Sequence, residues 1–321
     1  MDPRLNPSST NRGRFAPSPT GPLHFGSLVA AVGSYLHARR HGAQWLVRIE
    51  DLDPPREVPG VADLILRALE AHRLEWDGSV MRQSTRRDRY EAVLQALIER
   101  GIAYPCGCTR REIADSALHG IDGPVYPGTC RNGLPEGRGL RAWRIRTLDE
   151  TITFVDVHFG PIIQRVAREV GDFVLRRADG LYAYQLAVVV DDADQGITEV
   201  VRGADLIDST ARQIMLQRVL DFPTPAYMHL PIATDAAGEK LSKQTRAAPV
   251  DCSRPSRNLC DVLHFLGQLL PAGLIDEPPA TVLTWAAAHW DATAIPHSRS
   301  APAPWSACRA PNHATTGNCP R

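Results

Sequence analysis

Apolar residues recur at helical spacing in the first hundred positions of the chain. Leu28, Val32 and Leu36 follow one another every four residues, a pattern typical of one face of a helix. Short apolar runs that contain Trp, Val and Ile are instead typical of strands. The elements predicted in this way are a strand over 14–16, a helix over 26–40, a strand over 45–49 and helices over 61–72 and 88–100. Strands that alternate with helices indicate an α/β domain with a parallel sheet.

The middle of the chain interrupts this alternation. Residues 105–182 are rich in Gly, Pro and Cys and contain short β-like runs at 142–146 and 151–157. We therefore expect an insertion there, in an α/β domain composed of 12–104 and 183–250.

The second half of the chain contains four further patterns. The apolar run 184–190 predicts a buried strand. Residues 211–220 predict a helix, and 251–297 predict a short, mostly helical segment. The final residues, 298–321, contain no Leu, Ile, Val or Phe, which predicts a disordered tail.

Composition excludes several classes of protein. The chain has 321 residues, of which 43% are hydrophobic, so it can form a substantial core. Lys and Arg total 36 and Asp and Glu total 36, which argues against a generally basic nucleic-acid binder. No apolar run approaches the length of a membrane helix, and the polar N-terminus does not resemble a secretory signal. These features predict a cytoplasmic protein, and its seven cysteines are too few for a disulfide scaffold.

Two polar motifs, far apart in the sequence, suit an anionic ligand. Residues 14–27 predict a strand, a Pro/Gly-rich loop and a helix start, where backbone N–H groups attract phosphate. His24 stands just before that helix. Residues 238–244 place Lys240 and Lys243 on either side of a serine, and ammonium groups can neutralise a pyrophosphate leaving group. Taken singly, each motif is more simply explained as an ordinary βα turn or a solvated charged loop.

Together the two motifs resemble the signatures of class I aminoacyl-tRNA synthetases, as His24-Phe25-Gly26-Ser27 and Lys240-Leu241-Ser242-Lys243-Gln244. The stretches 14–24 and 48–53 resemble glutamyl-tRNA synthetases, and the likeness extends over roughly residues 12–250. It implies a Rossmann-like, doubly wound parallel sheet that binds nucleotide, with a zinc-bearing insertion over 105–182.

The chain departs from the full-length glutamyl-tRNA synthetases after Gln244. Only residues 245–297 remain before the predicted tail, too few for a large anticodon-binding region. The stretches 177–192 and 202–206 resemble the truncated paralogue family, the glutamyl-queuosine tRNA(Asp) synthetases. That resemblance implies a monomeric ligase that activates L-glutamate with ATP and Mg²⁺, without tRNA, and transfers glutamate to queuosine in tRNA(Asp). Two alternatives remain: an enzyme that charges tRNA(Glu) without an anticodon domain, and a non-catalytic tRNA-binding remnant.

The resemblance also assigns site residues. The side-chain carboxylate of glutamate would be held by Arg14, Tyr184 and Arg202, and its ammonium by Ala16, Ser18 and Glu50. His24 and Lys243 would be catalytic, and ATP would contact His24, Gly26, Ser27, Lys240, Ser242 and Lys243. Simpler explanations are structural ion pairs for the arginines, core packing for Tyr184, and a salt bridge from Glu50 to Arg48 or Arg56.

Three clustered cysteines suit a zinc ion. Cys106, Cys108 and Cys130 lie within 25 positions, and structural zinc takes four tetrahedral ligands. Spacing alone favours His119 as the fourth ligand, whereas the family resemblance favours Tyr126. The alternative is a set of reduced, metal-free thiols.

Overall fold

The computed structural model describes residues 11–116, 119–121, 123–235, 237–241 and 248–304. Its centre is a set of parallel strands. β1 (Arg12–Phe15) pairs with β2 (Gln44–Ile49), which pairs with the short β3 (Met81–Arg82). On the other side of β1, β11 (Glu199–Gly203) pairs with β12 (Ala226–Leu230). Thr198 N donates to Arg12 O at 2.9 Å, so the start of β11 lies beside β1.

The chain order therefore reverses direction across the sheet between β1 and β11. In doubly wound sheets, ligands bind in the crevice at the carboxyl ends of the strands that flank such a reversal. The topology thus brings the end of β1 and the end of β11 to one site. The expectation of a doubly wound parallel sheet is confirmed.

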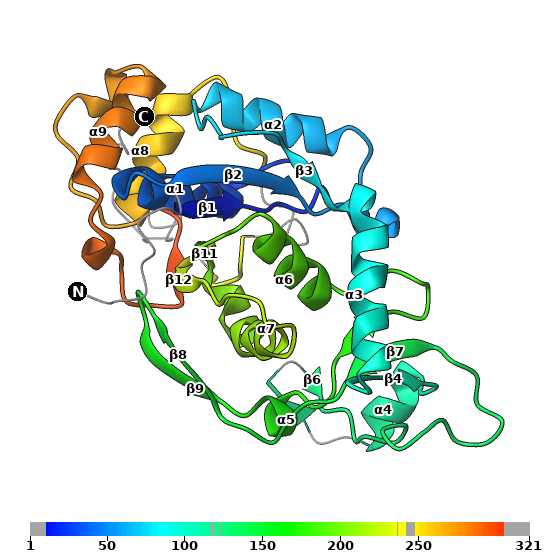
Figure 1. Ribbon diagram of the computed structural model, residues 1–321. Helices are drawn as coiled ribbons and strands as arrows, with labels where there is room; N and C mark the ends of the chain where they lie inside the picture. Colours follow the sequence, from blue (N-terminus) through cyan, green and yellow to red (C-terminus); the bar gives the residue numbers. More distant parts are fainter. Residues whose placement is uncertain (1–10, 117–118, 122, 236, 242–247, 305–321) are drawn as a thin grey trace.

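Helices cover both faces of this sheet (Figure 1). Neighbouring residues of one strand enter different cores, as Val201 and Val200 do in β11. The core on the Val201 side includes α1 (Phe25–Arg40), α2 (Val61–Ala71), α8 (Pro255–Phe265) and α9 (Pro279–His289). The core on the Val200 side includes α3 (Arg87–Glu99), α6 (Tyr184–Asp194) and α7 (Ile207–Val219). None of the helices in the described part of the chain is long and apolar enough to cross a bilayer.

Short elements occupy most of the region predicted as an insertion. They are β4 (Ala103–Cys106), α4 (Arg110–Ser116), β5 (His119–Gly120), β6 (Gly123–Pro124), β7 (Ala142–Ile145), β8 (Ile152–Asp156), β9 (Gly160–Gln164), α5 (Val166–Glu169) and β10 (Val174–Arg176). β10, β7 and β4 form an antiparallel sheet. The β8–β9 hairpin returns to the central strands, because Asp156 pairs with Tyr227 of β12.

The remaining short elements connect the larger ones. Five single turns of 3-10 helix are η1 (Pro54–Arg56), η2 (Gln83–Arg86), η3 (Ala204–Leu206), η4 (Leu274–Asp276) and η5 (Ala292–Ala294) among the described residues. Two strands, β13 (Ile232–Thr234) and β14 (Ser300–Pro302), pair in parallel.

One predicted element has the wrong type. The apolar run 184–190 is not a strand but the first two turns of α6. All of its residues from Gln185 to Asp192 are buried, because α6 packs beside α3 and α7 in the same core. A helix that is buried on every side has no polar face, so periodicity cannot distinguish it from a buried strand.

The predicted tail begins too early. Residues 300–302 form β14 against β13, and Ala303 is fully buried, its N–H donating to Thr234 O at 2.9 Å. Small residues form this strand because backbone pairing and an alanine in the core need no large side chain. Residues 305–321 of the predicted tail lie outside the described part of the chain.

Candidate active site

A cavity of about 570 Å³ lies at the carboxyl ends of β1 and β11. All ten predicted glutamate and ATP residues that the structure describes line it: Arg14, Ala16, Ser18, His24, Gly26, Ser27, Glu50, Tyr184, Arg202 and Lys240. The other two predicted ATP residues, Ser242 and Lys243, lie outside the described residues. Side chains up to 226 positions apart in the sequence thus share one cavity.

The start of α1 forms one wall of the cavity. His24 is the N-cap of α1, and its Nδ1 accepts from Ser27 N at 3.3 Å. Since Nδ1 accepts, Nε2 carries the ring proton, and Nε2 lies 3.0 Å from Ser27 Oγ. Gly26 leaves room for this ring, because a Cβ there would lie 3.3 Å from it. No acidic residue occupies the first turn, so the positive end of the helix dipole faces the cavity.

A buried network of charges lies under the cavity floor. Arg14 Nε and Nη2 donate to both carboxylate oxygens of Asp192, at 3.2 and 3.3 Å. Arg48, which is fully buried, donates to Asp192 at 2.7 Å and to Glu50 at 3.2 Å. Arg14 and Glu50 therefore do form ion pairs, with Asp192 and Arg48, as the simpler explanations of these residues expect.

These contacts and the burial of the two groups shift the pKa values of Asp192 and Glu50 in opposite directions. Burial would raise the pKa of Asp192, but Arg14 and Arg48 outweigh it and hold that pKa below its usual value. Burial dominates at Glu50 and raises its pKa, although Arg48 and Arg14 act against the shift. Glu50 thus lines the cavity as a carboxyl group whose charge an incoming ammonium would stabilise.

Arg202, at the end of β11, is buried and bound entirely by neutral groups. Its acceptors are His229 Nε2 at 3.1 Å, Gln213 Oε1 and Thr210 Oγ1 at 2.8 Å, Leu206 O at 3.3 Å and Tyr184 Oη at 3.4 Å. No Asp or Glu in the described part of the chain lies within ion-pair distance of it. The guanidinium therefore brings an unneutralised positive charge to the cavity, where an anion would stabilise it.

A histidine and an aspartate buttress Arg202 from behind. His229 Nδ1 lies 2.6 Å from Asp156 Oδ2, and both side chains are fully buried. Burial lowers the pKa of His229 to about 4, so the ring is neutral near pH 7, donates to Asp156 and accepts from Arg202. Asp156 belongs to β8, so the region predicted as an insertion contributes to the support of Arg202.

Lys240 lies on the opposite rim. Its ammonium is hydrogen-bonded to Asp205, which follows β11 and also lines the cavity. A larger cavity of about 1200 Å³ adjoins the first, with which it shares Ser18, Glu50 and Tyr184. Its lining residues include six arginines: Arg56, Arg110, Arg111, Arg141, Arg144 and Arg177.

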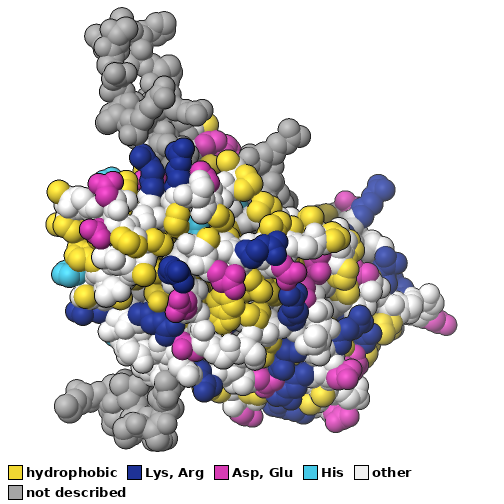
Figure 2. Space-filling model, turned by 90° about the horizontal axis from the view of Figure 1, so that it is seen from above, with side chains coloured by type: hydrophobic (Ala, Val, Ile, Leu, Met, Phe, Trp, Pro, Cys, Tyr) yellow, Lys and Arg dark blue, Asp and Glu magenta, His cyan; other side chains and the backbone are white. Residues whose placement is uncertain are grey.

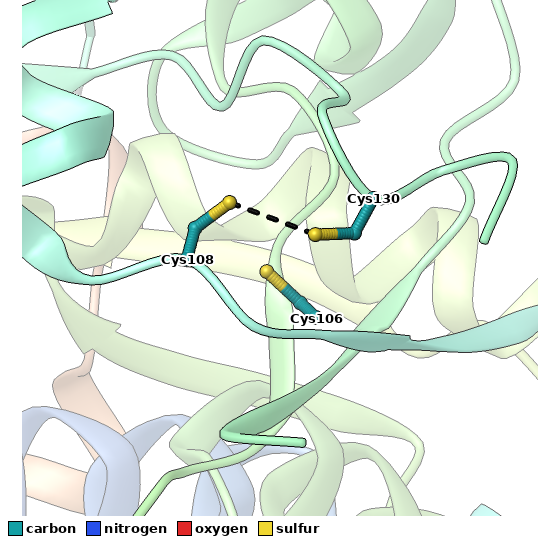
Figure 3. A group of neighbouring side chains, drawn as sticks. All are labelled: Cys106, Cys108 and Cys130. Carbon is teal, nitrogen blue, oxygen red and sulfur yellow. Dashed lines mark hydrogen bonds between the residues drawn. The ribbon is translucent and has the colours of Figure 1, made fainter. Parts of the chain in front are cut away.

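The three clustered cysteines point toward one another (Figure 3). Cys108 Sγ and Cys130 Sγ are 3.6 Å apart, close to the ~3.7 Å expected for two thiolates on one tetrahedral Zn²⁺ with Zn–S bonds of about 2.3 Å. Tyr126 Oη lies 3.3 Å from Cys106 Sγ and 3.7 Å from Cys108 Sγ. The side chain of His119 lies outside the described residues. The donor set therefore fits a zinc ion, with Tyr126 placed for a fourth position.

Arg144 supports this cluster. Its Nε donates to Cys106 Sγ at 3.3 Å, and its guanidinium lies over the Tyr126 ring at 3.9 Å. Burial would raise the pKa of Cys106, but hydrogen bonds from Tyr126, the Cys108 backbone and Arg144 lower it overall. A lowered thiol pKa favours the thiolate that binds metal.

Several site residues have no signal in the sequence. Asp192, Gln213 and Thr210 lie inside helices α6 and α7, and His229 lies inside strand β12. Their side chains become polar site groups only because the fold turns them toward an arginine. A buried polar residue within an apolar run, such as Asp192 after Val188–Val190, is the one hint that sequence offers.

Comparisons with known proteins agree with this geometry. Residues 11–255 match the family described as tRNA synthetases class I (E and Q), catalytic domain. The chain is 58% identical to the glutamyl-Q tRNA(Asp) synthetase of Dechloromonas aromatica over 291 residues, covering 90% of this chain and 97% of the relative. It is 53% identical to that of Neisseria meningitidis serogroup B over 294 residues, covering 90% and 99%.

A solved structure has the same fold. A glutamate tRNA ligase from Elizabethkingia meningosepticum, in complex with its amino acid, superposes with a TM-score of 0.74 at 26% identity. The match covers 92% of this chain and 67% of that one.

Proposed function

This chain belongs to the glutamyl-Q tRNA(Asp) synthetases, a family of class I, ATP-dependent ligases, and on that premise we propose that it activates L-glutamate without tRNA and transfers it to queuosine in tRNA(Asp). The proposal that the amino acid is glutamate rests on the surroundings of Arg202. A buried guanidinium held only by neutral acceptors is suited to a carboxylate. Glutamine, which is neutral at its side chain, would leave that charge uncompensated.

We propose that the substrate spans the cavity between opposite charges. The side-chain carboxylate lies against Arg202, Tyr184 and Arg14. Arg202 then gives up its two long hydrogen bonds, to Tyr184 Oη and Leu206 O, for shorter, charge-assisted ones to the carboxylate. The ammonium lies against Glu50, with Ser18 and the Ala16 backbone. Asp192 and Arg48 hold Arg14 and Glu50 in place from below.

Activation then joins glutamate to AMP. An oxygen of the α-carboxylate attacks the α-phosphorus of ATP, the bond to the β-phosphate oxygen breaks, and pyrophosphate leaves. Positioning and charge neutralisation assist this step, and Mg²⁺ bound with ATP would supply part of that neutralisation. The Ser27 hydroxyl accepts from His24 Nε2, so its own proton can go to a phosphate oxygen. Lys240 exchanges Asp205 for phosphate, and Lys243 is proposed as the second cation.

Transfer uses the adjoining cavity. A hydroxyl oxygen of the queuosine ring bonds to the carbonyl carbon of the adenylate, the bond from that carbon to the phosphate oxygen breaks, and AMP leaves with the bonding electron pair and takes up the hydroxyl proton. We propose that the larger cavity admits this nucleotide, because it shares Glu50 and Tyr184 with the first and its arginines suit phosphates. Zinc at Cys106, Cys108, Cys130 and Tyr126 would fix the wall of this cavity, to which Cys108 belongs.

The test is ATP–pyrophosphate exchange without any tRNA. Wild-type protein should catalyse exchange with glutamate and not with glutamine. Arg202→Gln should raise the KM for glutamate at least about tenfold, since a charge-assisted contact is worth ~1.5–3 kcal/mol, with little effect on the KM for ATP. Arg39→Gln, which removes an ion pair with Asp77 outside the cavity, is the matched control. Exchange that requires tRNA, or an unchanged KM in Arg202→Gln, would contradict the proposal.

A further inference from the structure

Three side chains of metal-ligand type converge at the end of α1 that is remote from the active-site cavity. His37 and His41 lie one helical turn apart at the end of α1, and Glu199 is the first residue of β11. One ligand atom from each lies within 4.8 Å of the other two. We propose that this histidine–glutamate trio binds a divalent transition-metal ion, Zn²⁺ first of all, at a site separate from the cysteine cluster.

The trio contains buried polar atoms that lack partners. Glu199 Oε2 and His37 Nδ1 are inaccessible to solvent and have no hydrogen-bond partner among the described residues. Glu199 Oε2 lies 3.7 Å from His37 Nε2, which is too long for a hydrogen bond. No Lys or Arg in the described part of the chain pairs with Glu199. Because buried polar groups are nearly always satisfied, a carboxylate beside an imidazole with nothing between them points to a bound cation.

His41 is already oriented as a ligand. Its Nδ1 lies 2.8 Å from the backbone oxygen of His37, and a carbonyl can only accept, so Nδ1 carries the proton. Its Nε2 is therefore left with a free lone pair. Metal-bound histidines commonly use the other ring N–H in this way, which fixes both tautomer and ring orientation.

The donor set selects the class of metal. Two imidazoles and one carboxylate suit Zn²⁺ and its neighbours Co²⁺, Ni²⁺ and Cu²⁺, whereas Mg²⁺ and Ca²⁺ prefer oxygen alone. His41 is exposed, which leaves a fourth position open to water. The trio lies roughly 18 Å along α1 from Gly26, at 1.5 Å per residue, so the ion would join α1 to β11 rather than take part in the reaction.

The chain offers a closely matched control in His289. This exposed histidine ends α9, and its Nδ1 lies 2.8 Å from the Trp285 backbone oxygen, the same local arrangement as in His41. It stacks on Trp285 instead of facing a second histidine and a carboxylate. His289→Ala therefore removes an equivalent histidine from outside the trio.

The experiment is Zn²⁺ binding by the full chain with its cysteines intact, measured by equilibrium dialysis and metal analysis. Wild type and His289→Ala should each bind one more Zn²⁺ per chain than His41→Ala does, or should bind this additional ion at least tenfold more tightly than His41→Ala does. Zn²⁺ should also raise the melting temperature of the first two proteins by more than that of His41→Ala. Cys108→Ser should keep the ion of the trio, which separates it from any ion at the cysteine cluster.

A second variant guards against misfolding. Glu199→Gln keeps the size of the side chain and should lose the same ion, and circular dichroism of each variant reports its fold. Equal zinc content in wild type and His41→Ala, together with a difference in affinity below tenfold, would overturn the proposal.

Discussion

At the scale of single residues, the site depends on how a few buried charges are held. Arg202 has no carboxylate partner in the described part of the chain, and a row of neutral groups fixes its position instead. His229 is one of these groups, and Asp156 holds His229 at 2.6 Å. We therefore regard Asp156 and His229 as positioning residues, which act on glutamate only through Arg202.

Substitution of Asp156 tests this role. Asp156→Leu should raise the KM for glutamate several-fold and leave kcat and the KM for ATP nearly unchanged, because Asp156 acts on the substrate only through His229 and Arg202. Its Oδ1 also accepts from His158 N and Phe159 N, which is why a second variant is needed. Asp156→Asn keeps an acceptor for His229 Nδ1 and should restore most of the affinity. The measurement is pyrophosphate exchange at varied glutamate. A uniform fall in kcat for both variants would indicate a general structural role instead.

The sequence identified the residues that line the cavity better than the residues that support them. Arg14 and Arg202 stand in recognisable motifs. Asp192 lies 178 positions from Arg14, and no local pattern links the two. Such a pairing follows from the topology of the sheet, which the sequence indicates only in outline.

At the scale of elements, the periodic segments near the N-terminus were predictable and the buried ones were not. Helix α1 has a strong four-residue repeat, and the structure confirms it within one residue at its start. Helix α6 is buried all round, so its run of valines and leucine looks the same as that of a strand. The difference is set by packing against α3 and α7 and not by local propensity.

Strand β14 gives a prediction at this scale. A chain that ends after His297 loses β14 and the buried Ala303, whereas a chain that ends after Pro304 keeps both. The shorter chain should have a lower melting temperature and weaker pyrophosphate exchange, because β14 pairs with β13 just before Lys240. Thermal unfolding and exchange assays compare the two. Identical behaviour would show that β14 contributes nothing.

The cysteine cluster gives a second prediction at the scale of elements. We expect Cys108→Ser to lose zinc from this cluster, and the variant should lose tRNA glutamylation more than pyrophosphate exchange, since Cys108 lines the larger cavity only. Cys252→Ser, an exposed cysteine outside the cluster, is the control. Metal analysis and the two assays report the outcome. Full glutamylation by a zinc-free Cys108→Ser protein would contradict it.

At the scale of the whole molecule, charge does not explain how an RNA would be recognised. Basic and acidic residues are equal in number, and they are interspersed over the face shown in Figure 2. We propose that recognition of tRNA comes from local features, such as the arginines of the larger cavity. A binding site of this kind favours a particular nucleotide over general attraction to phosphate.

The proposed acceptor is tested most directly by transfer of labelled glutamate to tRNA(Asp) with and without queuosine, with tRNA(Glu) in parallel. We expect tRNA(Asp) that contains queuosine to become labelled, and neither unmodified tRNA(Asp) nor tRNA(Glu) to be labelled. Labelling of tRNA(Glu), or labelling of tRNA(Asp) that does not depend on queuosine, would contradict it.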